Sequence, residues 1–299
     1  MFCDKRQINF VSPNLNNVID FLTELFQNYK SYSCINTARS ALSSFIKIEH
    51  KPVGEHPTII RLLKGMYNLR PSLPKSACIW DPDLVLQKLA KIAPAKFITL
   101  QQITHKLVCL LALVTGHRTQ TLHMLDIADM SETERGIQFT FSKLTKTSRP
   151  GYHTHPIYLE KFEPDKRLCV VFYLREYLQK TQHLRGNITK LFLTYQKPHK
   201  AATKDTVARW VKKQLQECGV DISIFSPHST RSASTSKASK LVPLSVVLKS
   251  AAWSNTSTFR KHYNKPVMSD KNFAHSILNS AVNARREKQK GEGEASSGE

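Results

Sequence analysis

The spacing of apolar residues from Asn14 to Arg70 predicts three short helices. The first repeats apolar residues at three- and four-residue intervals on one face, namely Leu15, Val18, Ile19, Leu22, Leu25 and Phe26. Asn14 can cap it by accepting a bond from an unpaired backbone N–H. The second is expected to begin at Ser33 and to bury Ile35, Ala38, Leu42, Phe45 and Ile46. The third starts near Pro57, a residue suited to a first helical position, so residues 1–75 form a helical bundle.

Prolines and a polar stretch interrupt this pattern at Pro71, Pro74 and residues 75–76, which predicts a domain boundary there. Beyond it, Asp81-Pro82 is typical of a capped helix start. A stronger helix begins at Thr99 and stops at Thr115-Gly116. We therefore expect domains at 1–75 and 76–285.

Period-two alternation of apolar residues over 137–141 predicts a half-buried strand. A turn at Pro150-Gly151 and an extended stretch near Ile157–Leu159 complete a hairpin. Helices are expected again at 168–181, 205–218, after His228, at 243–251 and at 270–284. Residues 286–299 are charged and rich in Gly and Ser, which predicts a disordered tail. The predicted fold class is α+β, mainly helical, with a small antiparallel sheet.

The charge balance points to a polyanionic partner. Lys and Arg number 44 against 23 Asp and Glu, a net charge of +21 with a pI near 9.8. Residues 190–265 carry +11 and residues 1–75 carry +5. Candidate phosphate contacts in the more basic region are Lys200, Lys204, Arg209, Lys212 and Lys213. A solvated helix face or an acidic protein partner would explain the same charges.

Two other classes of protein find no support in the sequence. No run of 18 apolar residues exists, so no membrane span is expected. The six cysteines lie far apart with no C-x-x-C pair, which predicts scattered buried thiols rather than a disulfide framework or a zinc site. His153 and His155 lack the cysteine or carboxylate neighbours of a metal site.

Three segments carry groups suited to phosphate chemistry. In LVTGHRTQTL (113–122), Arg118 follows the end of a buried-looking helix, where a guanidinium suits bidentate phosphate capture. In SPHSTRSAS (226–234), His228 and Arg231 lie three residues apart and share a helical face. Taken singly, the first segment is better explained by an ordinary surface arginine at a helix end, and an H-x-x-R pair is a common and weak signal.

The third segment, AWSNTSTFRKHY (252–263), places Tyr263 in a basic, aromatic setting. A phenol has a pKa of about 10, so as a nucleophile it needs nearby cations or a base to take its proton. Tyrosine packing at the edge of a core is the other interpretation.

In their order, these segments resemble the tyrosine recombinase (phage integrase) family, and most of all the recombinases of eukaryotic DIRS-like and Crypton-like mobile elements. The resemblance covers residues 80–285. It implies a catalytic set of Arg118, Lys146, His228, Arg231, Trp253 and Tyr263. Lys143 is the alternative hairpin lysine. Thr121 departs from the family, which commonly has an acidic residue there, so Arg118 needs another means of orientation.

The resemblance implies a site-specific recombinase or integrase that forms a 3′-phosphotyrosine intermediate on double-stranded DNA. It implies no metal or other cofactor, a homotetramer on two DNA sites, a core-binding role for residues 1–75, and a nuclear location. Two rival functions stay open at this point. One is an inactive DNA-binding protein derived from such an enzyme, and the other is a type IB topoisomerase-like enzyme.

Overall fold

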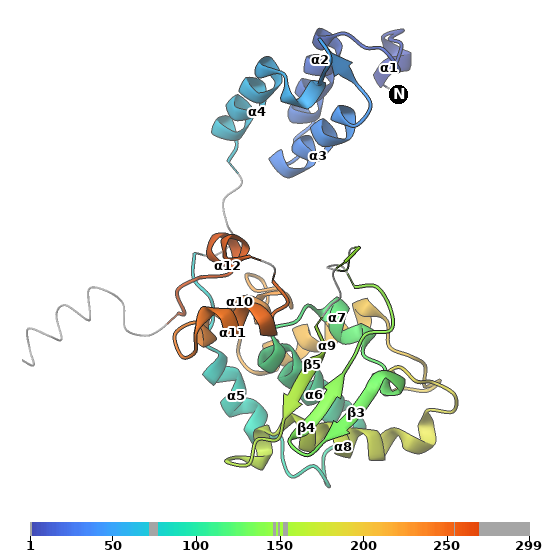
Figure 1. The fold of residues 1–299 in the computed structure, drawn as a ribbon, viewed down its shortest axis with the longest axis vertical. Helices are drawn as coiled ribbons and strands as arrows, with labels where there is room; N and C mark the ends of the chain where they lie inside the picture. Colours follow the sequence, from blue (N-terminus) through green and yellow to red (C-terminus); the bar gives the residue numbers. More distant parts are fainter. Residues whose placement is uncertain are drawn as a thin grey trace, which may run out of the picture. The chain divides into compact units, whose positions relative to one another are not determined.

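A computed structural model defines residues 2–71, 77–145, 148, 150–151, 155–253 and 255–268. The chain divides into two compact units, Met1–Lys75 and Ser76–Glu299 (Figure 1). Each unit has a hydrophobic core of its own. The predicted helix at 270–284 and the predicted tail lie outside the described residues.

The first unit consists of short helices and one two-stranded sheet. The helices are α1 (Phe2–Lys5), α2 (Leu15–Gln27), α3 (Tyr32–Ser43) and α4 (Pro57–Leu69). Strands β1 (Lys47–Ile48) and β2 (Lys51–Pro52) pair antiparallel, and the 3-10 turn η1 (Val53–Glu55) follows. The Asn14 side chain accepts from the Asn17 amide and closes a reciprocal capping box, which confirms the predicted cap.

Two details of the second predicted helix are wrong. It begins at Tyr32 rather than Ser33, because Ser31 provides the cap by accepting from the Cys34 amide. Phe45 is 58% exposed rather than buried, because the helix ends at Ser43 and the apolar register is lost beyond it.

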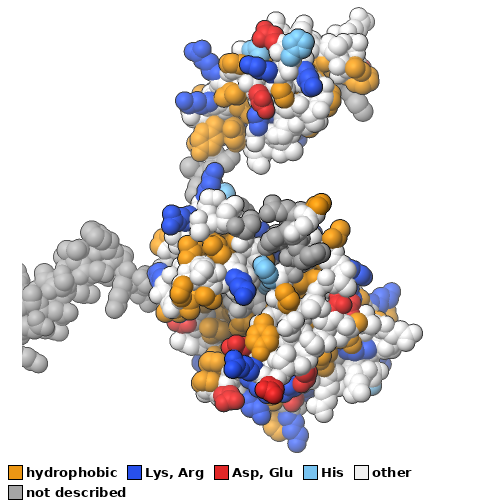
Figure 2. All heavy atoms as spheres, in the orientation of Figure 1, with side chains coloured by type: hydrophobic (Ala, Val, Ile, Leu, Met, Phe, Trp, Pro, Cys, Tyr) orange, Lys and Arg blue, Asp and Glu red, His pale blue; other side chains and the backbone are white. Residues whose placement is uncertain are grey.

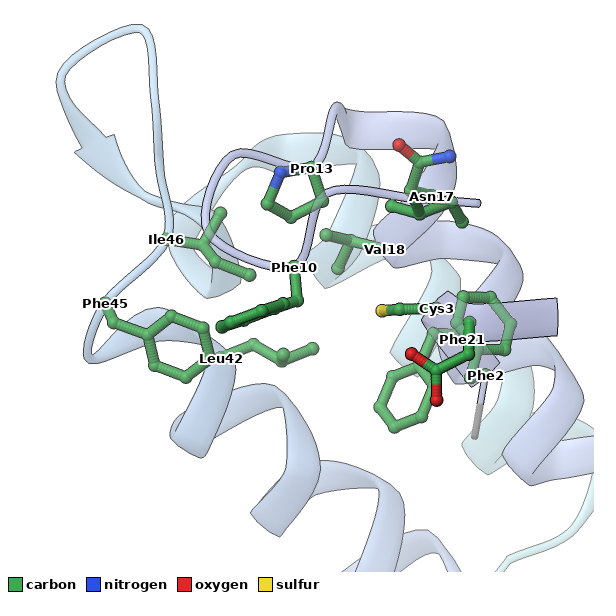
Figure 3. Close-up of a pocket in the computed structure, with 12 residues that line it drawn as sticks. Phe2, Cys3, Phe10, Pro13, Asn17, Val18, Phe21, Leu42, Phe45 and Ile46 are labelled. Atoms are coloured by element: carbon green, nitrogen blue, oxygen red, sulfur yellow. The ribbon is translucent and has the colours of Figure 1, made fainter. Parts of the chain in front are cut away.

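The first unit also holds an apolar cavity of about 450 Å³ (Figure 3). Phe10 and Phe45 line one side and Phe21 the other, together with Val18 from the unit's core. The rest of that core consists of Leu22, Ile35, Ile46, Val53, Ile59, Leu63 and Met66. This core contains eight buried apolar residues among those that the structure describes, so it is small.

The second unit surrounds the long helix α6 (Leu100–Thr115), which packs against α8 (Val170–Thr181), α9 (Lys204–Glu217) and α10 (Ser229–Ala238). Neighbours cover it on several sides, which is why its apolar residues are not confined to one stripe. Thr99 and Gln102 form its capping box, and Gly116 ends it with φ +62°, so both predicted ends are confirmed.

The other helices of this unit are α5 (Pro82–Lys91), α7 (Thr119–Met124), α11 (Leu244–Ser250) and α12 (Thr256–His262). Short 3-10 turns η2 (Ile127–Asp129), η3 (Lys166–Leu168) and η4 (Gln182–Leu184) join elements. In Figure 1, α10, α11 and α12 lie together at one end of the unit. The structure thus confirms helices near 168–181, 205–218 and 243–251 and after His228.

A three-stranded antiparallel sheet, in the order β3–β4–β5, completes the second unit. The strands are β3 (Met130–Thr133), β4 (Gly136–Phe139) and β5 (Ile157–Glu160), with Phe139 opposite Ile157. The predicted hairpin is β4–β5, although β4 ends two residues earlier than expected. The fold is mainly helical α+β with small antiparallel sheets, as the sequence predicted.

Within the described residues, no helix has the length and apolar character to cross a membrane. The same residues contain no cluster of three metal-ligating side chains. Cys109, Cys169 and Cys218 are buried, Cys3 and Cys78 are half-buried, and Cys34 is exposed. The expectation that the thiols would all be buried is therefore wrong, because Cys34 lies on the outer face of α3.

Candidate active site

Helix α10 forms the centre of the site, and the segment Trp80–Asp83, which leads into α5, holds it at both ends. At its start, the Trp80 indole N–H donates to the Ser229 hydroxyl over 2.8 Å. Near its end, the Lys237 ammonium pairs with the carboxylates of Asp81 and Asp83. The side chains that project from α10 are therefore held on a rigid element.

Arg231 projects from α10 into the interior and is fully buried. Its Nη1 donates to the Gly116 carbonyl and its Nη2 to the Ala251 carbonyl, each over 2.7 Å. Its Nε has no hydrogen-bond partner among the described residues. The guanidinium carbon lies 4.1 Å from the centre of the Trp253 ring, in cation–π contact. One helix thus connects the ends of α6 and α11 through a single guanidinium that keeps an unused donor.

Arg118 is the N-cap residue of α7, two residues after the left-handed Gly116. Its side chain is half-buried and makes no hydrogen bond or ion pair with a described residue. Thr121 bonds Arg118 only through its backbone amide, which donates to the Arg118 carbonyl over 2.9 Å. The Arg118 guanidinium is therefore available to an anion.

The two arginines lie close enough to repel each other. Burial, and then the positive charge of Arg118, lower the pKa of Arg231 to about 10, and Tyr263 opposes this shift. Arg231 therefore stays protonated at neutral pH. Neither arginine has a carboxylate in an ion pair within the part of the chain that the structure describes. Two cations that face one site without a counter-ion form a strong anion site.

Tyr263 caps the C-terminus of α12 and turns its side chain toward this pair. Its hydroxyl lies 3.0 Å from Nε2 of His228, the N-cap residue of α10. Its ring centre lies 4.6 Å from that of Trp253 and 5.3 Å from the Arg231 guanidinium carbon. The three predicted segments therefore meet around one phenol.

Trp253 packs in a small apolar cluster with Val247, Ala251 and Phe259. It is 9% exposed, and its indole N–H has no partner among the described residues. A buried donor without a partner costs about 1–3 kcal/mol. Trp253 and Arg231 thus both present an unused N–H donor beside Tyr263.

His117 also belongs to this site, although the sequence analysis did not select it. It is 6% exposed, and burial together with the charges of Arg231 and Arg118 lowers its pKa to about 4. It is therefore neutral at pH 7, so it adds no third positive charge. Its position between a helix-ending glycine and a candidate arginine was the available signal.

Of the two lysine candidates, the structure describes Lys143 alone. Both belong to the connection between β4 and β5, as the hairpin placement predicted. Lys143 is exposed and has no ion pair or hydrogen bond to a described residue. Lys146 lies outside the described residues, so the choice between the two stays a prediction.

The five candidate phosphate contacts are all exposed side chains on or just before α9: Lys200, Lys204, Arg209, Lys212 and Lys213. Lys204 pairs with Asp205 over 3.8 Å and Lys213 with Glu217 over 4.0 Å, so two of them are partly neutralised. On the face of the second unit seen in Figure 2, Lys and Arg side chains are scattered rather than gathered. Charge alone therefore does not mark a DNA path there.

Solved structures with the same fold include several DNA-recombining proteins. A lambda integrase fragment, crystallised as a dimer bound to a COC′ core site, has a TM-score of 0.52 and 16% identity, covering 87% of this chain and 83% of that chain. The Tn1549 transposon integrase in complex with transposon right end DNA has a TM-score of 0.56 and 16% identity, covering 91% of this chain and 85% of that chain. The XerH recombinase in a post-cleavage complex with palindromic difH has a TM-score of 0.56 and 14% identity, covering 84% of this chain and 69% of that chain.

At these identities the likeness shows a shared fold. Comparison with curated protein sequences gives no match. The sequence pattern of the Phage integrase family, in contrast, matches residues 85–269, which is most of the second unit and includes Arg118, His228, Arg231, Trp253 and Tyr263. The chain therefore belongs to the phage integrase family of tyrosine recombinases, which break and rejoin DNA strands.

Proposed function

We propose that Tyr263 is the nucleophile of a site-specific recombination reaction on double-stranded DNA. The observation that carries this proposal is the surroundings of the phenol. Its oxygen is 3.0 Å from an imidazole nitrogen. The Arg231 guanidinium and the Trp253 ring lie against the Tyr263 ring, and each carries a buried N–H donor without a partner among the described residues. Unused buried donors next to a nucleophile fit the non-bridging oxygens of a phosphodiester.

In the proposed reaction, the Tyr263 oxygen attacks phosphorus as the bond to the 5′-oxygen breaks. His228 accepts or positions the phenolic proton, and a lysine, Lys146 or alternatively Lys143, gives a proton to the departing 5′-oxygen. Arg118, Arg231 and Trp253 hold the non-bridging oxygens as charge builds up. The 3′-phosphotyrosine keeps the bond energy, so a 5′-hydroxyl from another strand completes the exchange without a nucleotide or metal cofactor.

Three finer statements also belong to the proposal. The first is that the protein integrates a mobile element of the DIRS-like or Crypton-like kind in the nucleus. This rests on the resemblance of the amino-acid sequences of the three segments to those recombinases. The second is that residues 1–75 bind the core of the DNA site, which their +5 charge and separate helical unit support. The third is that a homotetramer joins two DNA sites; a lambda integrase tetramer bound to a Holliday junction, which has the same fold, supports it.

A covalent-trapping experiment tests the nucleophile. A library of nicked duplexes with randomised sequence around the nick is incubated with the full chain, and protein–DNA adducts are isolated under denaturing conditions and sequenced. The nick lets the short cleaved strand diffuse away, which prevents rejoining. We expect adducts that converge on one sequence, and none with Tyr263→Phe.

Other outcomes identify the rival functions. Specific DNA binding without any adduct would show an inactive descendant. Relaxation of supercoiled plasmid by the monomer, without pairing of two sites, would show a topoisomerase-like enzyme. Adducts that persist in Tyr263→Phe would remove Tyr263 from the reaction.

A further inference from the structure

A buried hydroxyl on α10 holds the backbone around Tyr263. Ser236 is 1% exposed and lies eight residues after His228, about two helical turns along the same helix. Its Oγ donates to the Tyr263 carbonyl over 2.5 Å and accepts from the Lys265 amide over 3.1 Å. One side chain therefore bonds the main chain on both sides of Asn264.

This use of a helical hydroxyl differs from that of its neighbours. Serine and threonine within helices commonly donate back to a carbonyl of the previous turn. Thr235 does so, donating to the Arg231 carbonyl over 2.6 Å, and Ser239 donates to the Ser236 carbonyl over 3.0 Å. The Ser236 hydroxyl instead crosses to another segment, so it contributes to tertiary structure rather than to the helix.

The Tyr263 segment needs such an anchor because α12 ends at this point. Tyr263 has left helical geometry, with φ −122°, and the last bonds to the helix are those that the Tyr263 and Asn264 amides donate to the Phe259 carbonyl, each over 2.9 Å. Further along, Ile79 holds residues 266–268 through a parallel bridge in which its amide donates to the Pro266 carbonyl over 2.9 Å. Ser236 lies between these two anchors and is the side chain that bonds the Tyr263 carbonyl.

We propose that Ser236 is a positioning residue that fixes the Tyr263 backbone relative to Arg231. The Tyr263 backbone and the Arg231 guanidinium are then both held by one rigid helix, since α10 carries His228 and Arg231 as well as Ser236. This inference rests on the proposed function, in which Tyr263 attacks the phosphate. A displacement of about 1 Å in a nucleophile can lower a rate about 100-fold, so a bond to the nucleophile's own carbonyl bears directly on the chemical step.

The test compares three substitutions in the full chain. Ser236→Ala removes the hydroxyl, Ser236→Thr keeps it, and Ser239→Ala removes a hydroxyl that serves only its own helix. Two quantities are measured on the nicked duplex recovered by trapping, the single-turnover rate of adduct formation and the DNA dissociation constant. In addition, hydrogen exchange of the Lys265 and Leu110 amides is followed by NMR in the absence of DNA.

We expect Ser236→Ala to lower the cleavage rate about 10- to 100-fold with an unchanged dissociation constant. Its Lys265 amide exchanges faster, while that of Leu110, in the core of α6, stays protected and shows that the protein is folded. Ser236→Thr recovers most of the rate, and Ser239→Ala behaves like the wild type.

A wild-type cleavage rate in a folded Ser236→Ala protein would overturn the proposal, and so would a loss of rate matched by Ser239→Ala. Absence of adduct with the wild type would instead refute the proposed function. In that case the Lys265 exchange still decides whether Ser236 anchors the segment, so the two failures are distinguishable.

Discussion

Two buried arginines in the second unit show how the same side chain serves structure in one place and a reaction in another. Arg185, 6% exposed, uses every nitrogen of its guanidinium: Nε donates to the Thr181 hydroxyl, and Nη1 and Nη2 donate to the carbonyls of Lys190 and Leu191. Arg231 also donates to two carbonyls, but its Nε has no partner among the described residues.

Their electrostatic surroundings differ as well. Burial lowers the pKa of Arg185, and Tyr177 opposes the shift. Arg231 is buried more deeply and has a second cation, Arg118, as its neighbour. A fold gains nothing from a cation that is deeply buried, only partly bonded and next to a like charge. The comparison teaches that unused donors and uncompensated charge, rather than burial, distinguish the arginine that awaits a ligand.

Substitution of Arg231 should lower the rate of adduct formation more than any other change proposed below. Arg231→Lys keeps the charge but removes the planar fork that reaches two carbonyls and a phosphate together. We expect the single-turnover rate of adduct formation to fall by about 100- to 1000-fold, the effect typical of losing one transition-state donor. The rate is measured on nicked duplex DNA at saturating protein.

The same substitution at Arg185 should give the opposite profile. Arg185→Lys leaves buried carbonyls at residues 190 and 191 without donors, which costs about 3 kcal/mol of unfolding free energy. Urea denaturation measures this loss, and the cleavage rate of the folded protein should stay within about twofold of the wild type. A large rate loss in Arg185→Lys, or none in Arg231→Lys, would contradict the distinction between the two sites.

The pH dependence of stability offers a second way to separate the regions, because His117 lies beside Arg231. Its folded pKa of about 4 is below the ordinary value of 6.5, so it is neutral in both states above pH 6.5 and contributes nothing there. As the pH falls from 6.5 toward 4, His117 binds a proton in the unfolded chain but stays neutral in the folded protein. Folding stability should therefore fall over this window, by up to about 3 kcal/mol from His117 alone.

Denaturation of His117→Gln over the same pH range checks this assignment. His105, on α6 and away from the site, has a pKa also lowered to about 4, chiefly by burial, so His105→Gln serves as the matched control. Each variant should lose the part of the pH dependence of the unfolding free energy that its own histidine contributes. Bound phosphate should reduce the contribution of His117 and leave that of His105 unchanged, because only His117 faces the two arginines. Equal slopes in wild type and His117→Gln would refute the assignment.

The sequence predicted those parts of the molecule that local chemistry determines. The two ends of α6 follow from Thr99 and Gly116, and the β4–β5 hairpin follows from its alternating residues. It missed β3, because Met130–Thr133 forms an exposed, polar edge strand without apolar alternation. It also missed α7 and α12, whose six and seven residues are too few to show a helical period. The error at Phe45 has a related cause, since apolar spacing continues beyond the point where the helix ends.

The site divides in the same way. Arg118, His228, Arg231 and Tyr263 were selected from their chemistry and their order in the chain, and Trp253 from the family resemblance. The structure places His228, Arg231 and Trp253 around the Tyr263 side chain, with Arg118 close to Arg231. His117 and Ser236 were not selected, because a buried histidine and a helical serine acquire a role only through neighbours distant in sequence. Ser236 lies 27 residues from the carbonyl that it bonds. The choice between Lys143 and Lys146 depends on a connection that lies partly outside the described residues.

A smaller effect should follow from removing only the unused indole donor of the site. Trp253→Phe keeps an aromatic ring over the Arg231 guanidinium but deletes Nε1. We expect a loss of about tenfold in cleavage rate, equivalent to one hydrogen bond to a charged oxygen. Trp210→Phe, whose ring packs on His105 and Tyr195, is the control and should leave the rate unchanged. An unchanged rate in Trp253→Phe would mean that the buried N–H has no part in the reaction.

The smallest expected effect concerns the turns beside the two arginines. Gly186, next to Arg185, has φ +51°, which glycine adopts at no steric cost. Ala252, next to the carbonyl that receives Arg231, has the same φ of +51° but carries a β-carbon. The left-handed conformation costs a non-glycine residue about 1–2 kcal/mol. Ala252→Gly should therefore raise the unfolding free energy by about 0.5–1 kcal/mol, once the greater freedom of glycine in the unfolded chain is subtracted.

Ala251→Gly is the matched control, because Ala251 has an ordinary φ of −83°. There glycine relieves no strain and should lower the unfolding free energy by about 1 kcal/mol. Opposite signs at two adjacent alanines, measured by urea denaturation, would show that the turn beside Arg231 stores strain that its counterpart at Gly186 avoids. Loss of stability in both variants would contradict this. If Ala252→Gly also slows cleavage, the strain helps to hold the Ala251 carbonyl against Arg231; an unchanged rate would confine its effect to folding.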